Sequence, residues 1–274
     1  MTLISAPCPH RRSLLHWGLA GLATPATTVW AQAAAKAAPE QMLLYCGITM
    51  VKPMTEIAQL FEKQENVKIA IAQGGSEDIF QSVAKGTVGD WYLPGEPSYF
   101  QAPERQRFFA ERVLVGHNKM ALMVQKGNPK HIRPDLKELL RKDVVSIIGN
   151  PESGSVGKES RRMLQAAGLY DKVVRSVAFL APDSRSITNA LKKGDADVSL
   201  NWKATAYFPD NVDHLAAIEL DTTISPPQPL MLLRLHSSRR PDLATRFMKL
   251  ASGEDGQAIF RKYGFLDSHS KATR

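Results

Sequence analysis

Residues 43–61 have the sequence LLYCGITMVKPMTEIAQLF, and this segment decides the fold. Its first four residues predict a short apolar strand, which Gly47 ends. Thr49 is then predicted to cap a helix that has Pro53 in its first turn and apolar residues at helical spacing. A turn of this kind directs free backbone N–H groups and the positive end of a helix at one point, which favours an anion there.

The same order of strand, hydroxyl-bearing turn and helix recurs three more times. Strand-like runs lie at residues 67–72, 144–148 and 177–180. The turns that follow them contain Gly75-Ser76, Gly154-Ser155 and Ser184-Arg185-Ser186. A single hydroxyl at a helix start is usually only a cap. Four such turns after strands predict a site built from helix N-termini, because open α/β sheets bind ligands at the carboxyl ends of their strands.

The alternation of strands and helices along the chain predicts an α/β fold, with mostly parallel sheets and helices on both faces. We expect two lobes with a ligand cleft between them. Lobe 1 is predicted to comprise residues 42–118 and 230–266, and lobe 2 residues 119–229. The chain would then cross between the lobes near residues 118–121 and 225–230, and these two crossings predict a hinge.

The composition is that of a globular protein. The chain has 274 residues, of which 43% are hydrophobic and 23% charged, and its formal net charge is +8. Its basic residues are scattered and form no long run, which argues against a nucleic-acid partner. A mildly basic protein of this kind attracts small anions.

Residues 1–33 have the features of a signal peptide. Arg11 and Arg12 precede a moderately apolar stretch that is too short to span a membrane, and residues 31–33 read AQA, a cleavage pattern. We therefore predict export to the periplasm by the twin-arginine or the general secretory route, with removal of the signal. Residues 34–41 are predicted to be a linker and residues 267–274 a disordered tail.

The cysteines and histidines give no sign of a metal site or an enzyme. Cys8 would be lost with the signal, so Cys46 has no partner for a disulfide and is predicted to be a small buried residue rather than a soft ligand or reactive thiol. The sequence contains no Ser-His-Asp order and no CxxC, HExxH or Walker motif. We therefore expect no enzymatic activity, no metal and no cofactor.

Four pieces of the chain together resemble a known family. They are CGITMVKPMTEIAQLFEK, QGGSEDIFQSVAKGTVGDWYLPGEP, GNPESGSVGKESRRML and the closing GQAIFRKYGF. In this order and spacing they resemble the periplasmic solute-binding proteins of ABC importers, above all the molybdate-binding branch. The resemblance implies the type II periplasmic-binding fold. It also implies a tetrahedral oxyanion that hydroxyls and backbone N–H groups hold without a metal.

The resemblance also implies which residues bind the ligand. Thr49 takes the place of the first ligand hydroxyl and Ser76, after Gly75, the second. Backbone donors fall near Ser155 or Val156 in one turn of the second lobe, and near Ser186 or Ile187 in the next. Asn201 stands where the family commonly has a tyrosine. The cations expected at the rim, for steering the ligand, are Lys52, Lys158 and Arg185.

Several residues depart from the family pattern, so the identity of the ligand is not decided by the resemblance. Glu77 and Asp78 follow Ser76, where the family is usually neutral, and they either complement a helix N-terminus or indicate a ligand other than molybdate. A ferric-ion receptor would need tyrosines and acids, for which Glu77, Asp78 and Tyr92 are the candidates. The leading hypothesis is a monomeric receptor that delivers a molybdate- or tungstate-like oxyanion to the membrane subunits of an ABC importer. The alternative is a periplasmic sensor for a membrane kinase or chemoreceptor.

Overall fold

The structure, a computed structural model, describes residues 38–266 of the chain. The predicted signal peptide, the first part of the predicted linker and the predicted tail lie outside the described residues. The first strand begins at Glu40, so the last two residues of the predicted linker belong to a sheet instead. Within residues 38–266, no helix is both long enough and apolar enough to cross a membrane.

The first sheet has the strand order β2-β1-β3-β10-β4. Its strands are β1 (Glu40–Gly47), β2 (Val67–Gly74), β3 (Trp91–Leu93), β4 (Phe109–Asn118) and β10 (Gln228–Leu235). β1 pairs in parallel with β2 and β3, whereas β10 is antiparallel to β3 and β4. Four strands therefore share one direction and β10 opposes them. We call the elements around this sheet lobe 1.

The second sheet repeats this plan with the order β7-β6-β8-β5-β9. Its strands are β5 (Met120–Gln125), β6 (Ser146–Gly149), β7 (Leu180–Ala181), β8 (Val198–Trp202) and β9 (Leu215–Glu219). β6 is parallel to β7 and β8, and β5 is antiparallel to β8 and β9. We call the elements around this sheet lobe 2.

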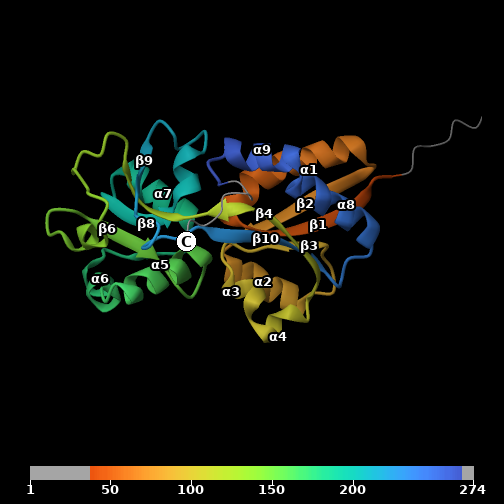
Figure 1. The fold of residues 1–274 in the computed structure, drawn as a ribbon, viewed down its shortest axis with the longest axis horizontal. Coiled ribbons are helices and arrows are strands. Elements are labelled where there is room, and N and C mark those ends of the chain that lie inside the picture. The colour runs from red at the N-terminus through yellow and green to blue at the C-terminus, as the bar shows by residue number, and fades with distance from the viewer. Residues whose placement is uncertain (1–37, 267–274) are drawn as a thin grey trace, which may run out of the picture. The chain divides into compact units, whose positions relative to one another are not determined.

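Helices cover both faces of the first sheet (Figure 1). On one face lie α1 (Val51–Gln64), α8 (Pro241–Ser252) and α9 (Glu254–Lys262). On the other lie α2 (Ser76–Lys85), α3 (Ser98–Gln101) and α4 (Pro103–Gln106). Successive side chains of a strand point to opposite faces of the sheet. In β1, Leu44 and Cys46 therefore pack into the core under α1 and α8, and Tyr45 packs into the core under α2. The short period of the strand thus gives one sheet two buried faces.

Lobe 2 is built in the same way around one core cluster. Its helices are α5 (Ser155–Ala166), α6 (Tyr170–Ser176) and α7 (Ser184–Lys193). In Figure 1, α7 lies on one side of the second sheet and α5 with α6 on the other. Three 3-10 turns complete the described structure: η1 (Ile48–Met50), η2 (Leu136–Leu140) and η3 (Lys203–Tyr207).

The predicted α/β fold with helices on both faces is confirmed, and the reversed strand in each sheet has a simple cause. β4 ends at Asn118 and β5 begins at Met120, so the chain runs straight from one sheet into the other. β10 makes the opposite passage. A strand that enters a sheet from the other lobe runs against strands whose carboxyl ends point toward that lobe. Each sheet is therefore mixed, with its ordinary strands ending at the junction of the two lobes.

Two local predictions are wrong. Thr49 does not cap α1, because η1 intervenes and Met50 occupies the N-cap position without a side-chain cap. The strand predicted at residues 177–180 is reduced to β7, because α6 continues to Ser176 and Val177 ends it. The Thr49 hydroxyl is therefore not used as a helix cap and can make other contacts in the candidate site.

Candidate functional site

Three of the recurring turns, together with η1, meet at one small cavity. Its volume is about 10 Å³, about the space of a single water molecule. It is lined by Ile48, Gly74, Gly75, Ser76, Gly154, Ser155, Val156, Asp183 and Ser184. The helices α2, α5 and α7 all begin in this lining. The structure therefore brings together Gly75, Ser76, Ser155 and Val156, which the sequence proposed as ligand residues from separate lobes.

Gly75 allows the two lobes to approach at this cavity. A Cβ atom on Gly75 would lie 2.2 Å from the carbonyl oxygen of Ser153. Gly95 plays a similar part, since its Cβ would lie 2.2 Å from the Ser155 hydroxyl. Side chains at either position would push the loops of the two lobes apart. The small residues in these turns thus serve close packing as well as the turns themselves.

The hydroxyls of Ser76 and Ser155 are held in matching ways. The backbone N–H of Gly95 donates to Ser76 Oγ at 3.1 Å, and Trp202 Nε1 donates to Ser155 Oγ at 3.3 Å. The hydroxyl of Tyr92 also donates to the Ser76 carbonyl at 3.0 Å. A serine oxygen that accepts one hydrogen bond still has its own proton to donate. Both side chains are therefore prepared to donate to a further acceptor.

The start of α7 corrects two predicted donors. Asp183 is the N-cap, and its carboxylate accepts a hydrogen bond from the Ser186 N–H at 2.7 Å. The Ile187 N–H donates to the Asp183 carbonyl at 3.2 Å. Ser186 and Ile187 line neither this cavity nor the larger one described below. Ser184, which the sequence did not single out as a ligand residue, lines both cavities. The capping residue Asp183 was the signal that could have located it.

Asn201 lies beneath the site rather than in it. Its side chain is fully buried, its Nδ2 donates to the Ser184 carbonyl at 3.2 Å, and its Oδ1 accepts from the Trp202 N–H at 2.8 Å. Asn201 lines neither cavity in this structure. Asn201 fixes the first residue of α7 relative to β8.

A larger cavity of about 380 Å³ adjoins the small one. Its lining consists of Ile48, Thr49, Val51, Lys52, Gln73, Ser184, Arg185, Thr188, Asn189, Thr205, Phe208, Asp210 and Asn211. Ile48 and Ser184 line both cavities. Thr49 Oγ1 donates to Ser184 Oγ across the lobes at 3.4 Å. Thr49 and Ser76, predicted as two hydroxyls of one site, thus lie in neighbouring cavities.

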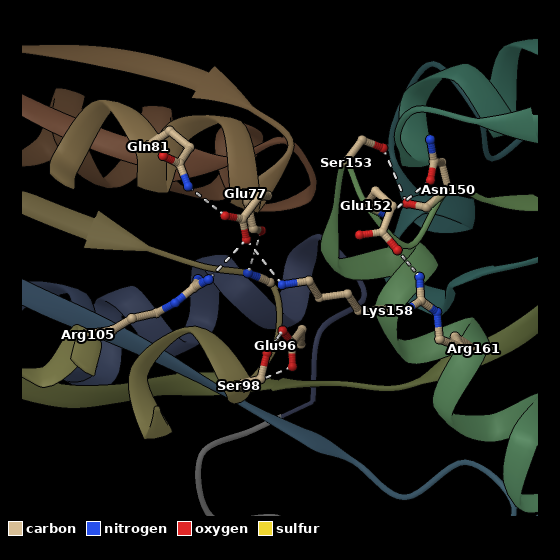
Figure 2. Close-up of polar contacts among 12 residues, drawn as sticks. Glu77, Gln81, Glu96, Ser98, Arg105, Asn150, Glu152, Ser153, Lys158 and Arg161 are labelled. Atoms are coloured by element: carbon tan, nitrogen blue, oxygen red, sulfur yellow. Dashed lines mark hydrogen bonds and ion pairs between the residues drawn. The ribbon is translucent and has the colours of Figure 1, made fainter. Parts of the chain in front are cut away.

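The three predicted rim cations each contact the opposite lobe. Lys158 Nζ lies 3.2 Å from Glu77 Oε2, and Figure 2 shows this lysine reaching across to Glu77 beside Arg105. Lys52 Nζ lies 2.9 Å from Asp210 Oδ1. Arg185 donates to the Gln73 side chain at 2.8 Å. These cations therefore hold the lobes together in this structure.

Glu77 belongs to an ion network and lines neither cavity. It accepts hydrogen bonds from Gln81 at 2.9 Å and from Arg105 at 3.2 Å, in addition to Lys158 (Figure 2). Burial acts to raise the pKa of Glu77, but the hydrogen bonds from Gln81 and Lys158 and the charges of Lys158 and Arg105 outweigh it, so the pKa is lowered. Glu77 is therefore an ionised partner of the cations.

Cys46 is fully buried and free, as predicted. Burial raises the pKa of its thiol, which keeps it protonated and unreactive. Tyr92 is also fully buried, with its hydroxyl bound to the Ser76 carbonyl. Residues 38–266 contain no group of three or more His, Cys, Asp and Glu side chains that is arranged to hold a metal ion.

Comparisons with known proteins agree with this architecture. Residues 42–266 match the family model described as bacterial extracellular solute-binding protein. The sulfate-binding protein of Synechococcus elongatus is 26% identical over 235 residues, covering 76% of this chain and 66% of that protein. The molybdate-binding protein ModA of Escherichia coli is 18% identical over 232 residues, covering 82% of this chain and 88% of that protein.

A solved periplasmic thiamin binding protein has the same fold, with a TM-score of 0.73 at 16% identity over 85% of each chain. The family match extends from β1 to the last described residue and includes both sheets and the turns that meet between them. The chain therefore belongs to the bacterial extracellular solute-binding protein family.

Proposed function

We propose that the protein captures a small oxyanion where η1, α2, α5 and α7 meet, and delivers it to the membrane subunits of an ABC importer. The observation that carries this proposal is the pair Ser76 and Ser155. The two serines come from different lobes, and each is the first residue of a helix. Each hydroxyl oxygen already accepts one hydrogen bond. An anion between them would accept a hydrogen bond from each hydroxyl. The positive ends of both helices would also stabilise its charge.

The donors of the small cavity suit an anion better than a cation. Asp183 is the ionisable residue of the lining, and its carboxylate is bound to the Ser186 N–H at the start of α7. The other polar groups offered by this lining are hydroxyls and backbone groups. Among the relatives, those named for sulfate and molybdate take tetrahedral oxyanions, which match this donor set. No described group in this lining forms the nucleophile-and-base pair that catalysis would need.

An oxyanion requires the lobes to move, because the cavity of about 10 Å³ is too small for four oxygens. The two crossing segments provide the hinge in this proposal. Ser225 Oγ donates to the Met120 carbonyl at 2.8 Å, which fastens one crossing to the other. Lys119, the residue between β4 and β5, is buried and donates to the Leu220 carbonyl at 3.3 Å. Closure around a ligand would then complete the site, as hinged receptors do.

The test is a screen of the mature protein against molybdate, tungstate, sulfate and phosphate, with ferric and divalent cations as the opposing set. Binding to the folded state raises the melting temperature. We expect at least one oxyanion to raise it and the cations to leave it unchanged. Stabilisation by cations alone would contradict the proposal. Calorimetry would then give the affinity of each anion that scores.

A further inference from the structure

The larger cavity, at about 380 Å³, is far larger than a small inorganic anion would fill. Its volume of about 380 Å³ falls within the roughly 300–1,000 Å³ of pockets that bind small organic molecules. It opens from the proposed anion site, since Ile48 and Ser184 line both cavities. The hydrogen bond from Thr49 to Ser184 joins its walls from the two lobes. A ligand held at the small cavity could therefore extend directly into this one.

The charges of the larger cavity argue against a cationic ligand body. Its lining includes Lys52 and Arg185 but only one acid, Asp210. Lys52 pairs with Asp210, and Arg185 binds the neutral side chain of Gln73, so one positive charge is not matched by a carboxylate within the lining. No excess negative charge is therefore available here for a cationic group. Phe208 adds an apolar surface to this wall.

Asn211, which lines the larger cavity, has a buried amide oxygen without a hydrogen-bond partner among the described residues. Its side chain is 3% exposed, and its Nδ2 donates to the Thr205 carbonyl at 2.8 Å. Its Oδ1 is buried and has no hydrogen-bond partner among the described residues. A buried acceptor without a partner is costly, so such atoms in native proteins call for an explanation. Because Asn211 lines the larger cavity, a ligand hydroxyl is the donor that would satisfy it.

We propose that the natural ligand is an organic oxyanion: a phosphate or sulfate monoester whose body carries hydroxyl groups. The anionic head would bind at Ser76 and Ser155, and the body would fill the larger cavity with one hydroxyl donating to Asn211 Oδ1. This inference rests on the proposed function, because the head uses the same anion site. It also explains why Thr49 and Ser76 line adjacent cavities, since one ligand would contact both.

The experiment compares matched probes by calorimetry on the mature protein. The phosphate arm uses glucose 6-phosphate, glycerol 3-phosphate and inorganic phosphate, and the sulfate arm uses glucose 6-sulfate and inorganic sulfate. Glucose alone serves as the probe without an anionic head. We expect a monoester in one arm to bind at least tenfold more tightly than the inorganic ion of that arm. Glucose should bind at least a hundredfold more weakly than its monoester.

A cavity-filling variant tests the location of the body. Asn189 lies on α7, is exposed and lines the larger cavity, so Asn189→Trp would occupy space there without disturbing the core. It should lower affinity for the monoester at least tenfold more than affinity for the inorganic ion. The matched control is Gln165→Trp, an exposed position on α5 outside both linings, which should bind as the parent does.

The outcomes separate this inference from the proposed function. Inorganic ions that bind as tightly as their monoesters would overturn the inference and leave the oxyanion receptor standing. Tight monoester binding that Asn189→Trp does not weaken would also overturn it, because the body would lie elsewhere. If neither inorganic nor organic oxyanions bind, the proposed function fails. Equal binding of glucose and glucose 6-phosphate would contradict the anion site.

Discussion

The small and the large cavity share Ile48 and Ser184 but are built from different groups. The small one is lined mainly by glycines, serines and the backbone of three helix starts. The large one is lined by longer side chains, among them Gln73, Arg185 and Asn211. Backbone donors recognise an anion whatever is attached to it, whereas side chains can recognise the attached group. The difference suggests that affinity for the head is set in one cavity and specificity for the body in the other.

The largest expected effect concerns the small cavity. Ser76→Ala and Ser155→Ala each remove one donor to a charged ligand, worth about 1.5–3 kcal/mol. The affinity for the anion should fall about 10- to 150-fold, at 1.4 kcal/mol per tenfold change. Calorimetry on the folded variants measures this. Each change also leaves a buried N–H without its acceptor, on Gly95 or Trp202, so stability should be measured in parallel.

Ser176→Ala is the control for this pair. The Ser176 hydroxyl donates to the Val173 carbonyl within α6 and lines neither cavity. Its variant should bind like the parent. Normal binding by both Ser76→Ala and Ser155→Ala would place the anion away from the junction of helix starts, and the comparison between the two cavities would lose its basis.

The next expected effect concerns closure. Gly75 has φ −58° and ψ 142°, which any residue can adopt, so Gly75→Ala introduces no backbone strain. Its Cβ would lie 2.2 Å from the Ser153 carbonyl oxygen in the structure described here, so the added methyl group would hold the two loops farther apart. Such overpacking costs about 1–3 kcal/mol, or about a 5- to 150-fold loss of affinity. Small-angle scattering at saturating ligand should show a larger radius than for the parent.

Gly154→Ala is a matched control on the opposite loop. A Cβ there would meet the Pro182 carbonyl at 3.4 Å and Gly75 Cα at 3.7 Å, which are ordinary contacts. We therefore expect little change in the scattering radius at saturating ligand. Equal effects of the two substitutions would show that the close approach of Gly75 to Ser153 does not decide closure.

A smaller effect is expected for Thr49→Ala, which acts on the large cavity. The substitution removes the hydrogen bond to Ser184 across the lobes and leaves the helix cap unaffected, because Thr49 lies in η1. A neutral hydrogen bond is worth about 0.5–1.5 kcal/mol, so affinity should fall about 2- to 12-fold. A loss as large as that of Ser76→Ala would mean that Thr49 contacts the anionic head directly, and the division between the cavities would need to be redrawn.

The smallest expected effect is on the ion pair of Glu77 with Lys158. Because the pKa of Glu77 is lowered in the folded protein, the pair contributes above the ordinary Glu pKa of about 4.3 and is lost as the pH falls through the lowered pKa. Ion pairs near the surface contribute about 0.2–1 kcal/mol. Glu77→Gln should therefore reduce affinity at pH 7 by up to about fivefold, and added salt should shrink the difference.

A comparison of pH profiles checks the origin of this effect. The parent should lose its advantage over Glu77→Gln as the pH falls through the lowered pKa of Glu77. The control is Glu62→Gln, since Glu62 pairs with Lys68 inside lobe 1 at 2.8 Å. That variant should change stability but not affinity. If Glu62→Gln changed the affinity as much as Glu77→Gln does, the loss of affinity would not come from the ion pair between the lobes.

The sequence by itself determined the layered fold and the position of the turns. Apolar runs identified β1, β2 and β6, and the Gly-Ser pairs marked the starts of α2 and α5. It also predicted the burial of Cys46 at a strand end. These features depend on local rules, because a turn, a cap and an apolar face are each set by residues a few positions apart.

Only the tertiary structure decided how these turns divide the site. The close approach of Gly75 to Ser153 and the hydrogen bond between Thr49 and Ser184 each join residues from different elements. Among residues 38–266, Asn211 Oδ1 is buried without a hydrogen-bond partner, which again depends on how the elements pack. In the same way, only the structure shows that the Ser186 N–H is bound to the Asp183 carboxylate and the Ile187 N–H to the Asp183 carbonyl. The packing of one lobe on the other decides which side chains line each cavity. Sequence patterns over a few neighbouring residues do not predict that packing.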